Sequence, residues 1–131
     1  MEPLILHRTK KTPSVIFQGG LIELEGRSTT NDPVMFYKPL QEWVNHYANH
    51  PEEFTAINIK LEYFDTASSK HLLDLLKTMD IGYKKGNKMV VNWYYEQGDD
   101  DMHDIGIYFE SFVKIPFKFQ EFSESTGIKD N

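Results

Sequence analysis

The organisation of this chain depends on residues 61–73, which read LEYFDTASSKHLL. A β-rich run ends at Phe64, and an apolar helical pattern starts near Leu72. Between them stand Asp65 and three hydroxyl side chains, which are residue types typical of a helix start. The first backbone N–H groups of a helix have no partner within the helix, and this end carries positive partial charge. The stretch therefore predicts a helix N-terminus that tolerates added negative charge.

Strand patterns occur on both sides of this junction. The clearest covers residues 55–64, where apolar side chains alternate onto one face; they are Ile57, Ile59, Leu61 and Tyr63. The adjacent glycines Gly19 and Gly20 separate two short β-like runs, residues 14–18 and 21–25, and predict a hairpin. Further strands are expected at residues 4–7, 88–95 and 115–122, the last at a sheet edge because it contains a proline.

Three helices are expected between these strands. After a loop over residues 26–33, Asp32 and Pro33 have the pattern of an N-cap and a first helical residue. Apolar residues then recur with helical spacing up to Tyr47, and Pro39 should kink this helix or mark its start. The second helix should end near residues 81–82, and the third covers residues 102–112.

The alternation of strands and helices defines the fold class. Parallel neighbours need crossover connections, so the later strands should form a sheet covered by the helices. The early hairpin makes this sheet mixed. The prediction is a single α/β domain over residues 1–131, with a mixed sheet, about three helices and a polar tail at residues 123–131.

Composition narrows the function classes. The 131 residues are 40% hydrophobic and contain no cysteine, which excludes disulfides, thiolate metal sites and cysteine nucleophiles. A net charge of −6 argues against nucleic-acid binding, which needs clustered Lys and Arg. No apolar run is long enough to span a membrane, and no signal peptide is recognisable, so we expect a cytoplasmic protein.

The junction itself allows two interpretations. In the first, Asp65 or Thr66 only caps the second helix. In the second, one of Thr66, Ser68 and Ser69 accepts a phosphoryl group, which adds nearly two negative charges. The helix end would tolerate this charge, whereas a partner packed on the same surface would have to desolvate or repel it. The two interpretations are compatible, since the helix end that needs a cap can also hold a phosphate.

The acidic loop at residues 96–104 offers an alternative site. Its carboxylates could bind a divalent metal or another small ligand, but Gly98 precedes the aspartates, so the spacing of a calcium-binding EF-hand loop is missing. We expect a solvated loop that favours the start of the third helix, with no metal. Neither Ser68 nor Ser69 has a recognisable partner base and oxyanion hole, and we expect no enzyme and no cofactor.

Taken together, several fragments resemble SiaC-type regulatory phosphoproteins, which are similar to SpoIIAA-like anti-sigma-factor antagonists. The Asp65–Lys70 segment resembles the family's Asn-Thr-Ser-Ser region, although Asp65 replaces the usual Asn and Ala67 replaces a Ser. The other fragments match in order and spacing over most of the chain. They are Thr12-Pro13, Gly26-Arg27-Ser28, Phe36-Tyr37-Lys38-Pro39-Leu40, Trp43 with Tyr47, Leu61-Glu62-Tyr63-Phe64, Trp93-Tyr94-Tyr95 and residues 99–106.

This resemblance implies a function. It implies a STAS-like fold and a bacterial, non-catalytic signalling protein that is modified by a Ser/Thr kinase and a PPM-type phosphatase. The unphosphorylated form would bind and activate a partner such as a diguanylate cyclase. By position Thr66 matches the family's phosphorylated threonine, with Ser68 and Ser69 as the other candidates. Asp65, Thr66, Ser68, Ser69 and Lys70 would contact the partner. An interaction adaptor that is never modified is the remaining alternative.

Overall fold

The strands form one seven-stranded sheet whose order across the sheet is the order along the chain. The structure is a computed structural model that describes residues 1–123 and 127–128. The strands are β1 (Leu4–Leu6), β2 (Ser14–Gln18), β3 (Leu21–Ser28), β4 (Phe54–Phe64), β5 (Lys88–Glu96), β6 (Phe117–Ser123) and β7 (Gly127–Ile128). The helices are α1 (Pro33–Tyr47), α2 (Thr66–Lys84) and α3 (Asp100–Glu110).

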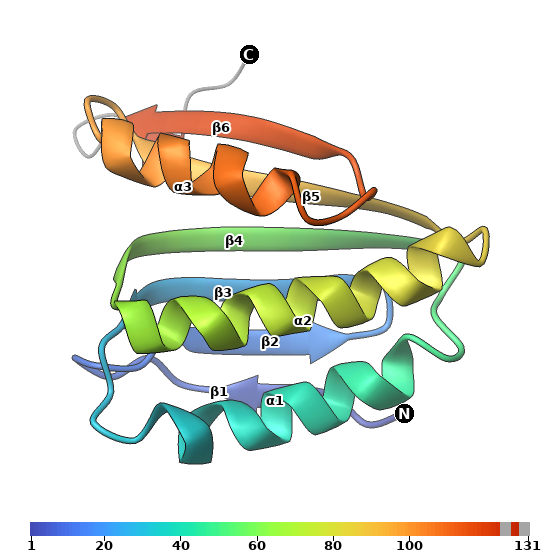
Figure 1. The fold of residues 1–131 in the computed structure, drawn as a ribbon. Coiled ribbons are helices and arrows are strands. Elements are labelled where there is room, and N and C mark those ends of the chain that lie inside the picture. Colours follow the sequence, from blue (N-terminus) through green and yellow to red (C-terminus); the bar gives the residue numbers. More distant parts are fainter. Residues whose placement is uncertain (124–126, 129–131) are drawn as a thin grey trace.

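The sheet is mixed, as predicted. Strands β1 to β3 pair antiparallel, and so do β6 and β7, whereas β3, β4, β5 and β6 are parallel neighbours. Each parallel pair is joined through one helix, and all three helices lie on the same face of the sheet (Figure 1). The predicted α/β architecture is therefore confirmed. The predicted hairpin is confirmed too, and Gly20 supplies the positive φ of 84° that its turn requires.

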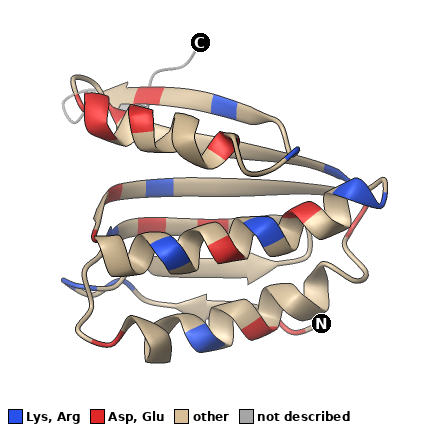
Figure 2. Ribbon diagram, viewed as in Figure 1, with Lys and Arg blue, Asp and Glu red and all other residues tan. Residues whose placement is uncertain are grey.

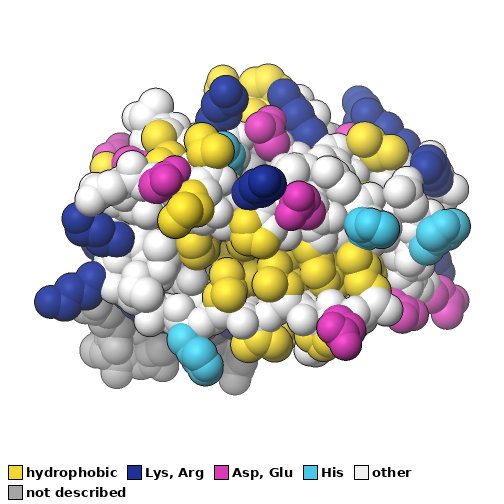
Figure 3. Space-filling model, turned by 90° about the horizontal axis from the view of Figure 1, so that it is seen from below, with side chains coloured by type: hydrophobic (Ala, Val, Ile, Leu, Met, Phe, Trp, Pro, Cys, Tyr) yellow, Lys and Arg dark blue, Asp and Glu magenta, His cyan; other side chains and the backbone are white. Residues whose placement is uncertain are grey.

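One hydrophobic core lies between the sheet and the helices. Successive side chains of a strand point to opposite faces of the sheet, so every second side chain points toward the helices and into this core. Its largest fully buried side chain is Trp93 on β5, whose indole Nε1 donates to the carbonyl oxygen of Met102 on α3 at 3.0 Å. Its ring also packs edge-on against Phe109. On the side where β1 and α1 lie, hydrophobic side chains reach the surface (Figure 3).

The face of the sheet without helices carries polar side chains that are hydrogen-bonded across the strands. Asn92 on β5 donates to Asn58 on β4 at 2.8 Å, and Asn58 donates to Glu23 on β3 at 3.1 Å. The Lys60 ammonium lies 3.5 Å from the same Glu23 carboxylate. These contacts connect three neighbouring strands and help to fix their register.

Two predictions near Gly26 are wrong. The predicted loop at residues 26–33 begins only after Ser28, because β3 continues through Gly26, and Tyr63 is exposed although its alternation predicts burial. Gly26 pairs with Leu61, but Arg27 pairs with Tyr63, so the register shifts by one residue. This bulge reverses the faces of the last residues of β4, and Phe64 takes the buried position.

Other boundaries differ by small amounts. Pro39 neither starts nor ends α1, which runs from Pro33 to Tyr47 with Asp32 as its N-cap. The last long strand, β6, was expected at the edge and as the end of the folded chain, yet β7 pairs with its final residues. Of the predicted polar tail, residues 124–126 and 129–131 lie outside the described part of the chain.

Gly106 allows α3 to approach the sheet closely. A Cβ atom at this position would lie 2.6 Å from the Trp93 ring and 2.7 Å from the Phe119 ring. We therefore expect Gly106→Ala to destabilise the protein by about 1–3 kcal/mol through overpacking, although alanine is the better helix former. Urea unfolding would measure this, with Asp104→Ala on the exposed side of the same helix as the control. A Gly106→Ala protein as stable as the parent would contradict the close packing.

Candidate functional site

Asp65 forms the N-cap of α2. Its carboxylate Oδ1 accepts a hydrogen bond from the backbone N–H of Ser68 at 2.9 Å, and its carbonyl oxygen accepts from the N–H of Ser69 at 3.0 Å. The Asp65 N–H in turn donates to the carbonyl oxygen of Ser28 at 3.1 Å, which ties the junction to the end of β3. The capping prediction is confirmed for Asp65, and Thr66 is the first residue of the helix.

The three candidate hydroxyls differ in accessibility. Thr66 is exposed, Ser69 is half-buried, and Ser68 is fully buried with a relative exposure of 0%. Lys70 is exposed next to them. A protein kinase could reach Thr66 in the folded state, whereas the Ser68 hydroxyl lies inside the protein. The structure thus places Asp65, Thr66, Ser69 and Lys70 together at an accessible helix end and separates Ser68 from them.

Ser68 belongs to a buried cluster of three hydroxyls. Its Oγ lies 2.8 Å from Oγ of Ser28, which in turn lies 2.6 Å from the phenol oxygen of Tyr37. All three side chains are buried, and they come from α2, β3 and α1 respectively. The cluster therefore joins the start of α2 to the first turns of α1 through the last residue of β3.

Sequence reasoning alone assigned no role to Ser28 and Tyr37. Both lie in fragments that support the family resemblance, but their meeting with Ser68 depends on tertiary structure. One signal was available, because Ile22, Leu24 and Gly26 alternate inward and extending that pattern to Ser28 predicts a buried hydroxyl. A buried serine needs hydrogen-bond partners, which would have directed attention to nearby polar side chains.

Tyr37 faces His71 as well as the two serines. The two rings are stacked with their centroids 5.1 Å apart and their planes within 2° of parallel. Burial raises the pKa of the Tyr37 phenol to about 12; hydrogen bonding with Ser28 and Ser68 lowers this pKa, and the nearby Asp65 carboxylate raises it. The phenol therefore stays protonated and acts as a hydrogen-bond donor at neutral pH.

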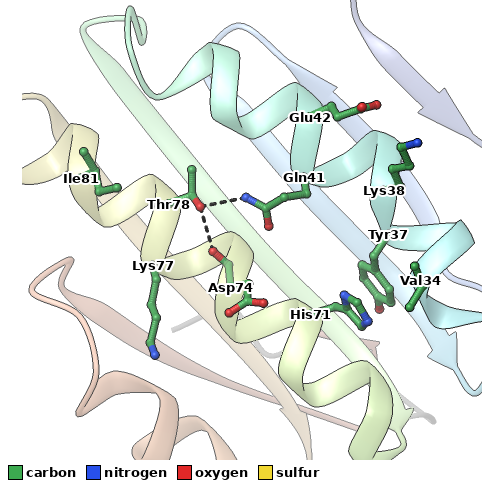
Figure 4. A pocket seen from close by; sticks show the side chains of 10 residues that line it. All are labelled: Val34, Tyr37, Lys38, Gln41, Glu42, His71, Asp74, Lys77, Thr78 and Ile81. Atoms are coloured by element: carbon green, nitrogen blue, oxygen red, sulfur yellow. Dashed lines mark hydrogen bonds between the residues drawn. The ribbon is translucent and has the colours of Figure 1, made fainter.

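A groove between α1 and α2 begins at this stacked pair. Its volume is about 550 Å³, and Tyr37 and His71 lie at one end of it (Figure 4). Along its length the Gln41 amide of α1 donates to the Thr78 hydroxyl of α2 at 2.8 Å, which holds the two helices together. The groove is thus adjacent, through Tyr37, to the hydroxyl cluster at the start of α2.

Thr66 itself lines a different cavity, an acidic hollow of about 460 Å³. Carboxylates of the first turns of α3 line it, together with Glu62. Acidic residues are concentrated at the start of α3 (Figure 2). One of these, Asp99, caps α3 by accepting from the Met102 N–H at 3.0 Å, so the predicted role of the loop as a helix start is confirmed. Within the described residues no group of three or more His, Asp or Glu side chains is arranged to hold a metal ion.

The site and fold together define a class of protein. Residues 6–122 match the sequence model of a family described as SiaC family regulatory phosphoprotein. The class is therefore that of regulatory phosphoproteins. Since the match covers most of the chain, this protein belongs to the SiaC family.

Three relatives are distant from this chain in sequence, and the two with solved structures share its fold. The uncharacterized protein PA14_02130 of Pseudomonas aeruginosa (strain UCBPP-PA14) is 21% identical over 126 residues, which cover 95% of this chain and all of the relative. The crystal structure of apo-SiaC from Pseudomonas aeruginosa superposes with a TM-score of 0.82 at 19% identity, covering 91% of this chain and 98% of that chain. A chain from the crystal structure of the diguanylate cyclase SiaD in complex with its activator SiaC, from the same organism, also gives 0.82, at 20% identity and with 90% and 98% covered.

Each helix in the part of the chain that the structure describes is too short or too polar to cross a membrane.

The capping bond of Asp65 can be tested by two substitutions. Asp65→Ala removes the acceptor for the Ser68 N–H, and we expect it to cost about 0.5–2 kcal/mol of stability. Asp65→Asn keeps an acceptor oxygen, so we expect it to retain most of that stability. Thermal unfolding of both variants would measure the difference, and equal losses would show that the capping geometry is not what stabilises the junction.

Because the pKa of Tyr37 is raised, we expect the free energy of unfolding to fall at high pH. Its pKa is raised from 10 in the unfolded chain to about 12 in the folded protein. The stabilisation from the neutral phenol is complete below pH 10 and is lost as the pH rises toward 12, by about 3 kcal/mol at most. Tyr37→Phe lacks this titration. We expect the parent to lose more stability than Tyr37→Phe between pH 10 and 12, measured by urea unfolding; parallel losses would contradict the buried phenol.

Proposed function

We propose that this protein is a non-catalytic regulator whose affinity for an output partner is set by phosphorylation of Thr66. The observation that carries the proposal is the exposed Thr66 hydroxyl in the first turn of α2, beside the Asp65 cap. A phosphate at this place lies at the positive end of the helix dipole, so the folded state tolerates it. Membership of a family of regulatory phosphoproteins supports the same conclusion.

The output partner that we propose is a diguanylate cyclase, bound and activated by the unphosphorylated protein. The support is that a structural relative, SiaC, is the activator of the diguanylate cyclase SiaD. We propose that Asp65, Thr66, Ser69 and Lys70 contact this partner, and that Ser68 acts from the interior. A Ser/Thr kinase and a PPM-type phosphatase would add and remove the phosphate, and because a kinase needs ATP we assign this exchange to the cytoplasm.

The electrostatics of the site explain how phosphorylation would weaken binding. Thr66 already borders carboxylates, among them Glu62, Asp101 and Asp104. A phosphate adds nearly two further negative charges to this acidic surface. A charge that a partner desolvates without pairing it costs about 3–5 kcal/mol, which corresponds to roughly two to four orders of magnitude in affinity.

Phosphorylation and partner binding can be tested together. The purified protein would be incubated with the Ser/Thr kinase of the same organism and ATP, and the modified residue mapped by mass spectrometry. We expect phosphate on Thr66, none on Ser68, and no incorporation into Thr66→Ala. We also expect Thr66→Ala to bind and activate the diguanylate cyclase as the unmodified parent does, and the phosphorylated protein to bind about 100-fold more weakly or worse.

Other results would redirect the proposal. Phosphate on Ser69 alone would move the acceptor within the same helix end. A protein that no kinase of the organism modifies, and that still binds the cyclase, would instead be an interaction adaptor. Calorimetry with Mg²⁺ and Ca²⁺ distinguishes the proposed function from the alternative of a metal-binding site at residues 96–104. The proposed function predicts no heat of binding, whereas the metal site would give a measurable heat.

A further inference from the structure

The hydroxyl cluster of Ser28, Tyr37 and Ser68 has only one arrangement of its protons. Ser68 Oγ donates to the carbonyl oxygen of Ser28 at 3.0 Å, and Ser28 Oγ donates to Ser68 Oγ at 2.8 Å. Each hydroxyl has a single proton to donate, so the remaining contact, at 2.6 Å, is a bond from the Tyr37 phenol to Ser28 Oγ. Every donor in the cluster is used, and all three side chains are buried.

The cluster is closed into a ring by the cap of α2. The Asp65 N–H donates to the Ser28 carbonyl oxygen, and the Asp65 carboxylate accepts from the Ser68 N–H. Thr66 lies between Asp65 and Ser68 in the chain, inside this ring of hydrogen bonds. A change at Thr66 that moves the first turn of α2 therefore also disturbs the hydrogen bonds that connect this turn to Ser28 and, through Ser28, to Tyr37.

A phosphate on Thr66 would produce such a change. It is negatively charged, like the adjacent Asp65 carboxylate, and can accept hydrogen bonds from the same backbone N–H groups at the helix start. The Ser68 N–H that Asp65 now accepts is one of them. A displaced Ser68 would leave a buried hydroxyl without its partner, which is unfavourable, unless Ser28 and Tyr37 move with it.

On the far side of the cluster, Tyr37 belongs to α1 and stacks on His71 at the end of the groove between α1 and α2 (Figure 4). We infer that Ser28, Tyr37 and Ser68 transmit the phosphorylation state of Thr66 to α1, with Tyr37 as the positioning residue that links the two helices. The inference rests on the proposed function and adds to it: the response to Thr66 depends on a phenol in another helix that never touches the phosphate.

A double-mutant cycle tests this coupling. Affinity for the diguanylate cyclase would be measured for the parent and for Tyr37→Phe, each unmodified and phosphorylated on Thr66, with the modification verified by mass spectrometry. Tyr37→Phe removes one oxygen and keeps the ring against His71. We expect the factor by which phosphorylation weakens binding to be about tenfold smaller in Tyr37→Phe than in the parent, because the charge on Thr66 still acts directly on the partner and only the part transmitted to α1 is lost. A merely structural role of Tyr37 would lower both affinities by the same factor.

Tyr47→Phe is the matched control. Tyr47 is also a buried tyrosine of α1, but its phenol lies at the other end of the helix, where it contacts Thr55 Oγ1 at 2.8 Å and accepts from the Gly20 N–H at 2.9 Å. We expect this variant to keep the full response of the parent to phosphorylation. A response reduced equally in both variants would overturn the inference, because loss of any buried phenol would then explain it.

A second measurement separates this inference from the proposed function. In amide NMR spectra of the free protein, phosphorylation of Thr66 should shift signals of residues 34–41 in the parent and in Tyr47→Phe, but not in Tyr37→Phe. If phosphorylation leaves cyclase binding of the parent unchanged, the proposed function is wrong, and the spectra still decide the coupling. Shifts of residues 34–41 that are the same in Tyr37→Phe, or absent from the parent, would overturn the inference.

Discussion

The structure depends on one constraint, the right-handed sense of the crossovers between parallel strands. Strands β3, β4, β5 and β6 are successive parallel neighbours, so each crossover steps in the same direction across the sheet. Right-handed connections that step in one direction place their helices on one face. All three helices accordingly cover one face. Each begins next to the carboxyl end of the strand that precedes it, so the three helix starts lie on the same side of the molecule (Figure 1). The buried cluster at Ser28 and the acidic surface at Asp99 both exist because these helix starts are neighbours.

The geometry of a helix that lies on a sheet explains why one helix end can combine two properties that seem to conflict. Thr66 is accessible to other proteins, yet two residues later Ser68 is completely buried. A helix lying on a sheet turns successive side chains through 100°, so an exposed and a buried position lie within one turn. Chemistry at the surface is thereby adjacent to hydrogen bonds in the interior. In this protein the interior partners belong to β3 and α1, which precede α2 in the chain.

Local patterns in the sequence were sufficient to predict the α/β architecture. Alternation in residues 55–64, the two glycines of the hairpin and the Asp32-Pro33 pair act over a few residues, and each predicted the right element, although the alternation placed Tyr63 on the wrong face. Long-range effects were not accessible in this way. The exposure of Tyr63 results from a shift in pairing with β3. Likewise, nothing local distinguishes Ser68 from Thr66 and Ser69 as a buried side chain, because its partners are about 30 to 40 residues away in the chain. The acceptor function of Thr66 stays a prediction.

The order of strands in the sheet has a consequence for how the protein is made. Since the order from β1 to β7 equals the order along the chain, every strand joins at the growing edge, and none has to be inserted between two strands that are already paired. The hairpin of β2 and β3 can form as soon as its residues leave the ribosome, and each following helix and strand then finds a finished neighbour. Synthesis from the N-terminus can thus proceed together with folding, and Ser28 is already in place when the segment with Thr66 and Ser68 emerges.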